Sequence, residues 1–170
     1  MKPKPVLVAE IVDDIRRIFQ VLSEQSRRVE HETSLTGPQL WVIKMLEETS
    51  PMKVSELARR MYLNTTTMVG LLDRLETRNL VSRTRSEKDR RVVHISLTEQ
   101  GRDLVRNSPE VVQSLLVKGL EAHTAQKLIK ISEELKDVTK ILGVQEVPPK
   151  LIMSPEINMP KPKKKGSISL

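Results

Sequence analysis

The chain has 170 residues, of which 38% are hydrophobic and 30% are charged, so it is long enough for one domain with a buried core. It contains no cysteine, which excludes disulfides, thiolate metal sites and thiol redox switches, and its 2% of aromatic residues disfavours stacking on unpaired bases. No stretch approaches 18 consecutive apolar residues, and acidic residues interrupt the apolar start of the chain, so a cytoplasmic protein is predicted rather than a membrane or secreted one.

The net charge of +7 is concentrated in two parts of the chain. Residues 53–106 carry twelve basic and seven acidic side chains, and residues 143–170 carry five basic and two acidic ones, whereas the other segments are almost neutral. A basic block inside a neutral scaffold is typical of a module that binds a polyanion. A solvated charged surface would give the same counts, so charge alone does not decide between the two.

Two long amphipathic helices are predicted near the ends of the folded part. Apolar residues recur at steps of three and four from Val8 to Leu22, and again from Leu128 to Leu142. Such narrow apolar stripes either pack on each other within one chain or join two copies of it. We expect residues 5–32 and 108–142 to form a dimerisation region.

The middle of the chain predicts three helices and a tight turn. Thr36 and Gln39 form a capping box for a helix that runs to about Glu48. A short helix begins near Val54, and Asn64 caps a further helix over residues 65–79. About three residues separate these two helices, which is helix-turn-helix spacing. Their predicted buried residues are Leu57, Ala58, Met61, Met68, Leu71, Leu72 and Leu75.

A β-hairpin with a basic tip follows these helices. Residues 81–85 and 92–97 alternate as two short strands, and the loop between them, residues 86–91, is charged. Thr98 then caps another helix, which Ser108-Pro109 interrupts. Residues 53–101 thus read as helix, turn, helix, hairpin and helix, the element order of a winged helix-turn-helix.

Beyond residue 142 the composition changes. Residues 143–170 contain five of the ten prolines and four lysines between residues 161 and 165, which predicts an extended or disordered appendage. An alternative is that this tail docks on the body through Leu151, Ile152 and Met153.

Three stretches together resemble MarR-type bacterial transcription regulators. They are VSELA at 54–58, MVGLLDRLE at 68–76 running into Leu80-Val81, and DRR at 89–91 followed by LTEQG at 97–101. The resemblance extends over residues 5–142. It implies a mainly α-helical fold: a winged helix-turn-helix with a two-stranded wing, plus N- and C-terminal helices that form a dimerisation domain. Lys53, Asn79 and the tail depart from the family's pattern.

The predicted DNA contacts lie at the start of the recognition helix and in the wing. The first turns of a recognition helix meet base edges in the major groove, where Thr65, Thr66 and Val69 would read the sequence. Capping and solvation are the alternative for the polar residues of the helix, and ion pairing is the alternative for Arg74 and Arg83. For Arg90 and Arg91 the alternative is a solvated charged turn. By resemblance, Asp89 orients Arg91. The full set is Asn64, Thr65, Thr66, Val69, Gly70, Arg74, Arg83, Lys88, Asp89, Arg90 and Arg91.

The resemblance also implies a small aromatic or lipophilic effector, bound between the dimer helices and the winged domain. The residues that could line such a site are Phe19, Trp41, Met45 and Met61, with core packing as the alternative for each. No cofactor, metal site or enzymatic activity is predicted, since the three histidines fall in different elements.

The function expected from these features is sequence-specific control of transcription. A homodimer would bind a pseudo-palindromic site on double-stranded DNA, most simply as a repressor. The alternative is a helical protein-interaction adaptor whose basic face is incidental.

Overall fold

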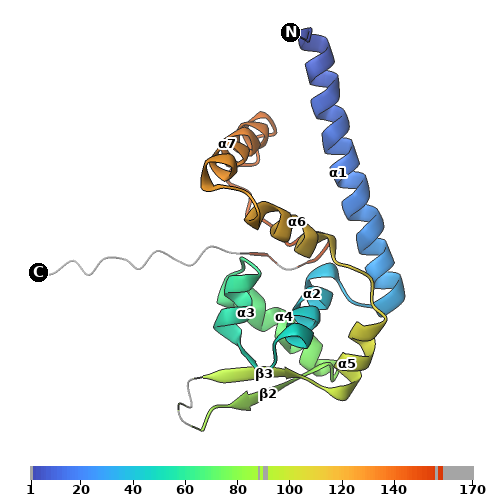
Figure 1. Cartoon of the computed structure of the whole chain (residues 1–170), viewed down its shortest axis with the longest axis vertical. Helices are drawn as coiled ribbons and strands as arrows, with labels where there is room; N and C mark the ends of the chain where they lie inside the picture. The colour runs from blue at the N-terminus through green and yellow to red at the C-terminus, as the bar shows by residue number, and fades with distance from the viewer. Residues whose placement is uncertain (1, 88, 90–91, 156, 159–170) are drawn as a thin grey trace, which may run out of the picture.

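The computed structural model describes residues 2–87, 89, 92–155 and 157–158, which form a mainly helical molecule with one small sheet (Figure 1). The long helix α1 and the C-terminal helix α7 project to one side, and the β-hairpin lies at the opposite end. The described elements are α1 Lys4–Thr33, α2 Gly37–Glu48, β1 Met52–Lys53, α3 Val54–Arg60, α4 Thr65–Thr77, β2 Val81–Arg85, β3 Val93–Leu97, α5 Glu99–Arg106, α6 Val112–Glu121 and α7 Ala125–Ile141.

Three predicted helix starts are confirmed by their hydrogen bonds. Gln39 Oε1 accepts a hydrogen bond from the backbone N–H of Thr36 at 3.0 Å, before α2. Asn64 Oδ1 accepts from the N–H of Thr67 at 2.8 Å at the start of α4, and Thr98 Oγ1 accepts from the N–H of Gly101 at 3.0 Å at the start of α5. Each cap satisfies a backbone donor that the helix itself leaves unpaired.

The sheet has three antiparallel strands in the order β1-β3-β2. The predicted hairpin is confirmed as β2 and β3, with Val81 opposite Leu97, although β3 begins at Val93 rather than at residue 92. The two-residue strand β1 was not predicted, because so short a strand shows no alternation. It places Met52 opposite Ile95, and both side chains are buried. The base of the wing is therefore attached to the segment that leads into α3.

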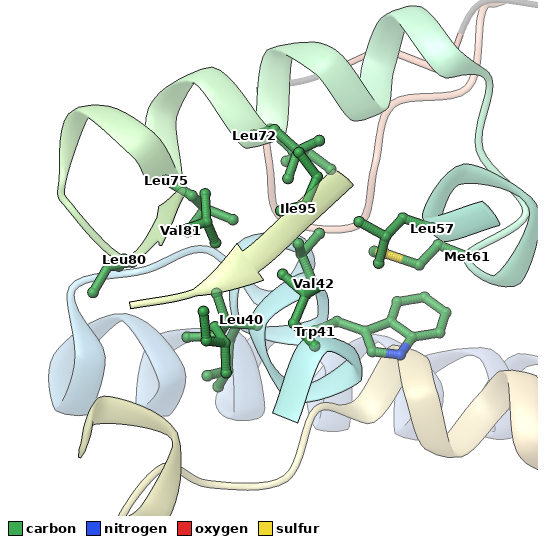
Figure 2. Close-up of a cluster of buried hydrophobic side chains, with 14 of the residues drawn as sticks. Leu40, Trp41, Val42, Leu57, Met61, Leu72, Leu75, Leu80, Val81 and Ile95 are labelled. Carbon is green, nitrogen blue, oxygen red and sulfur yellow. The ribbon is translucent and has the colours of Figure 1, made fainter. Parts of the chain in front are cut away.

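One hydrophobic core lies between the helix-turn-helix, the sheet and α2 (Figure 2). The helix α2 contacts α1, α4, α5, α6 and β3, so it occupies the centre of this core. The predicted inward residues of α3 and α4 are all buried, which confirms the two helical faces. This packing holds α3 and α4 in a fixed orientation relative to the hairpin.

The apolar stripes of the terminal helices remain exposed in the single chain. Only Val29 and Thr33 of α1 are buried, and α7 buries no residue at all. The stripes therefore are not covered by an intramolecular helix pair. Exposed apolar residues on these helices and on α6 include Val8, Ile11, Ile15, Ile18, Leu115, Leu116, Ile129 and Leu135. Within the described part of the chain, no helix is long and apolar enough to cross a membrane.

The tail corrects an expectation. The prediction of an extended appendage is wrong for the described residues 149–155 and 157–158, because Leu151 packs against the core and Gln113 Nε2 donates a hydrogen bond to the carbonyl of Ile152 at 3.1 Å. Met153 is exposed, so only two residues of the apolar triplet dock. The lysine- and proline-rich end dominates the composition of the tail and favours the appendage, whereas Leu151 and Ile152 fit the docking alternative. The lysines from 161 to 165 lie outside the described residues.

Candidate nucleic-acid interface

The helix α4 has one buried face and one open face. Its buried apolar side chains are Met68, Leu71, Leu72 and Leu75. Because successive residues of an α-helix are rotated by about 100°, Thr66 and Val69 point away from that side. Thr65, Thr66 and Val69 are exposed, and a side chain added at Gly70 would meet nothing within 4 Å. The predicted reading residues thus share one accessible surface at the start of the helix.

Asn64 is engaged within the chain. Its side-chain oxygen caps α4, while its backbone N–H and its Nδ2 both donate to Asn158 Oδ1 at 2.9 Å. Thr67 is only 7% exposed and donates through Oγ1 to the carbonyl of Ile157 at 2.8 Å. The structure therefore separates the first turn of α4 into an exposed side and a flank that is occupied by the tail.

Arg83 of β2 is held by two carboxylates of α4. Its guanidinium lies 2.5 Å from Asp73 Oδ1 and 3.3 Å from Glu76 Oε2, and its side chain is 28% exposed. This arrangement fits the ion-pairing alternative and ties the wing to the recognition helix. Arg74 is exposed on α4.

Arg78 has a role that sequence reasoning missed. Its guanidinium donates to the backbone carbonyl of Ser34, and to that of Thr33 at 3.5 Å. These carbonyls lie at the C-terminal end of α1, so Arg78 ties the end of α4 to the end of the long helix. No local sequence pattern identifies such a contact, because its partners are backbone atoms 44 and 45 residues away.

The wing loop is only partly described. The N–H of Val92 donates to the carbonyl of Asp89, and the N–H of Ser86 donates to the carbonyl of Val92, both at 2.9 Å. These bonds connect the described ends of the loop, and the strands β2 and β3 that carry it extend away from α5 to one edge of the molecule (Figure 1). Lys88, Arg90 and Arg91, which are predicted DNA contacts, lie outside the described residues. The orientation of Arg91 by Asp89 therefore stays a prediction.

Three of the four predicted effector residues border cavities between the winged part and α6. Trp41 and Met61 line a cavity of about 200 Å³, together with Leu116 and Leu151. Trp41 and Met45 line another of about 350 Å³. Trp41 and Met61 are also buried members of the core. Phe19 is 69% exposed on α1 and borders neither cavity, so the chain alone does not bring it to this region.

A hydrogen bond crosses the rim of the larger cavity. Tyr62 Oη, in the turn of the helix-turn-helix, donates to Glu121 Oε1 at the end of α6 at 2.7 Å. This bond to a carboxylate raises the pKa of Tyr62 above 10.0. The native state then holds the phenol proton more tightly than the unfolded chain does. Any stability that this pair gives the fold is present at a pH below the pKa that Tyr62 has in the unfolded chain. It is lost as the pH rises through the higher pKa that Tyr62 has in the folded protein.

This difference can be measured directly, since the chain has a single tyrosine. We expect ultraviolet titration of the folded protein to give a Tyr62 pKa above its ordinary value. Glu121→Gln should return it toward that value, because it removes the charge on the acceptor. The urea-unfolded chain supplies the reference at about 10. Identical titration curves for the wild type and the variant would contradict the assignment.

The described residues contain no cluster of three or more His, Asp or Glu side chains placed to hold a metal ion. The described residues present an exposed helix face and a projecting hairpin, and the sequence of residues 53–106 is basic. A module that docks in a nucleic-acid groove has this combination of features.

Comparisons with known proteins identify this arrangement. The sequence model of the MarR family matches residues 35–93. HTH-type transcriptional repressor MdtR of Bacillus subtilis (strain 168) is 28% identical over 167 residues, which cover 98% of this chain and 99% of that protein. The uncharacterized HTH-type transcriptional regulator YsmB of the same organism is 30% identical over 144 residues, covering 80% of this chain and 99% of the relative.

Solved structures agree on the fold. A MepR-like protein crystallised with pseudoligands has a TM-score of 0.55 and 25% identity, and the match covers 81% of this chain and 98% of that one. Streptococcus pneumoniae FabT, solved in complex with DNA, shares the fold with a TM-score of 0.54 at 21% identity, over 80% of this chain and 97% of its own. The chain belongs to the MarR family and is a winged helix-turn-helix transcriptional regulator.

Proposed function

We propose that the protein is a ligand-responsive repressor that binds double-stranded DNA as a homodimer. The observation that carries this proposal is the exposed face of α4, where Thr65, Thr66 and Val69 lie beside an open Gly70. The first turns of a recognition helix are the part that enters the major groove, and a glycine there lets the backbone approach closely. The similar protein MdtR is named a transcriptional repressor, which supports repression rather than activation of transcription.

The proposal assigns two roles along the chain, DNA binding and dimerisation. Residues 53–101 bind DNA, with the helix reading bases and the wing holding the backbone or the minor groove through Arg90 and Arg91. Residues 5–32 and 108–142 join two copies through their uncovered apolar stripes. Two-fold symmetry then favours a pseudo-palindromic operator whose half-sites lie about 10 base pairs apart.

The proposed effector is a small aromatic or lipophilic molecule bound between the winged part and the dimer helices. Trp41 and Met61 supply apolar walls on the winged side, and Leu116 and Val117 supply them on α6. The MepR-like structure, crystallised with pseudoligands, supports a ligand site in proteins of this fold. A molecule there would touch both parts and could change the spacing of the two recognition helices.

The test is selection of genomic DNA fragments by the purified protein, followed by a salt titration on the selected site. We expect affinity to fall steeply with salt while the preference over random DNA persists, because phosphate contacts are electrostatic and base contacts are not. Recovery of no preferred sequence would favour the adaptor alternative. A selected site with one unpaired half-site would contradict the dimeric arrangement.

The roles of single residues can be separated on that operator. Thr66→Ala should weaken binding by roughly 1–3 kcal/mol at one base position, since it removes a base contact, whereas Arg91→Ala should weaken binding to all sequences. Thr77→Ala is the matched control, because Thr77 is exposed at the far end of the same helix. Binding assays on single-base operator variants make the measurement. Equal losses of both variants on operator and random DNA would overturn these roles.

A further inference from the structure

The described part of the C-terminal segment, residues 149–155 and 157–158, is bound to the first turn of the recognition helix. Asn158 Oδ1 accepts two hydrogen bonds from Asn64, and Asn158 Nδ2 donates to the carbonyl of Tyr62 at 3.2 Å. The carbonyl oxygen of Ile157 accepts a hydrogen bond from the hydroxyl of Thr67. One short segment therefore contacts both the turn of the helix-turn-helix and the start of α4.

The other end of the segment is attached to α6 and to the core. Gln113 of α6 donates to the carbonyl of Ile152, and Leu151 packs against the core. The segment also closes on itself, since the N–H of Asn158 donates to the carbonyl of Pro149 at 2.8 Å and Lys150 pairs with Ile157 in a β-bridge. It is thus a folded loop that links α6 to α4.

The loop leaves the reading surface open. Helical geometry places Asn64 and Thr67 on the flank of α4 nearer the core, about 100–160° around the helix axis from Thr66. Thr65, Thr66 and Val69 stay exposed while the loop is docked. A loop in this position does not cover the face that would meet DNA. It therefore supports the helix and does not block its access to DNA.

We propose that this loop, through its described residues 149–155 and 157–158, is a brace that holds the first turn of the recognition helix in its DNA-binding orientation, with Asn158 as the positioning residue. The inference rests on the proposed DNA-binding function. Arg78 ties the opposite end of α4 to α1, so the brace completes the attachment of the helix at both ends. If the brace is lost, the first turn samples other orientations, and the apparent affinity falls with the fraction that remains competent.

Two truncations isolate the brace from the lysine-rich end. A chain ending at residue 158 keeps the brace, a chain ending at residue 148 lacks it, and both lack residues 159–170. We expect the shorter chain to bind the operator about three- to tenfold more weakly than the longer one at the same salt concentration, from the loss of a few hydrogen bonds. Equal affinity, or tighter binding by the shorter chain, would overturn the proposal.

Single substitutions in the full chain give the second arm. Asn158→Ala should weaken operator binding to a similar extent, whereas Asn107→Ala, an exposed asparagine at the end of α5, should not. In a double-mutant cycle with Asn64→Ser, which keeps an oxygen for capping, the two losses should not add. Full additivity would show that Asn158 does not act through Asn64.

Amide hydrogen exchange without DNA separates this inference from the proposed function. Loss of the brace should speed the exchange of residues 63–68 about three- to tenfold while the amides of α2 stay protected. Unchanged exchange at residues 63–68 would show that the loop is not docked and would overturn the brace. A further outcome is that the wild-type protein prefers no operator, while loss of the brace still speeds the exchange of residues 63–68. That outcome would refute the proposed function, and with it the role of the brace in DNA binding.

Discussion

Replacing Ile11 and Ile15 with glutamate should convert the protein to a monomer that no longer binds an operator. Both side chains lie on the apolar stripe of α1 and are 55% and 46% exposed in the single chain. Fully burying an exposed isoleucine is worth about 1.5–3 kcal/mol, and about half of each side chain is still exposed in the single chain, so the four isoleucines of a dimer contribute roughly 3–6 kcal/mol of association energy. Glutamate removes this term and places like charges together at the interface.

The measurement is molar mass by light scattering, combined with operator binding. Gln20→Glu with Arg27→Glu is the matched control, because both residues are exposed on the opposite side of the same helix. This control should remain dimeric and should retain operator preference. A dimer that survives the two isoleucine substitutions would show that the stripe of α1 is not the interface.

Gly101→Ala should destabilise the fold severely. A Cβ atom at Gly101 would lie 2.1 Å from the carbonyl oxygen of Leu80 and 3.1 Å from Leu97 Cδ2. That carbonyl cannot easily move, because it accepts a hydrogen bond from the N–H of Thr98 at 3.2 Å, where β3 leads into α5. Overpacking against backbone usually costs 1–3 kcal/mol, and we expect a loss of about 3 kcal/mol in the free energy of unfolding.

Thermal or urea unfolding tests this expectation. At the size of this chain, a loss of about 3 kcal/mol corresponds to roughly 6–12 °C in Tm. Gly119→Ala is the control, since a side chain there meets nothing within 4 Å in the interior of α6. It should raise stability by about 0.5–1 kcal/mol, because alanine loses less conformational entropy in a helix. Equal stability of the two variants would show that the contact with Leu80 is not restrictive.

Local patterns were sufficient to predict most of the fold. Asn64 and Thr98 cap the helices that they were expected to cap. These features depend on residues three or four positions apart, so the sequence displays them directly. The periodic faces of α3 and α4 are equally local.

Contacts between distant residues could not be predicted in this way. The strand β1 is defined only by its pairing with β3, some 40 residues later, and two residues cannot show a period. The docking of Asn158 on Asn64 joins residues 94 positions apart. Arg83 was left open between DNA and ion pairs, because its carboxylate partners come from another element. Such contacts depend on the folded arrangement, which local spacing does not contain.

The position of Trp41 gives the molecule an optical reporter of its own. It is the single tryptophan, it is 9% exposed, and it borders two cavities between the winged part and α6. The emission maximum of an indole shifts with the polarity of its surroundings. Entry of a guest molecule or a change in the angle between the two parts would therefore alter the colour and intensity of one fluorophore, without any label attached to the protein.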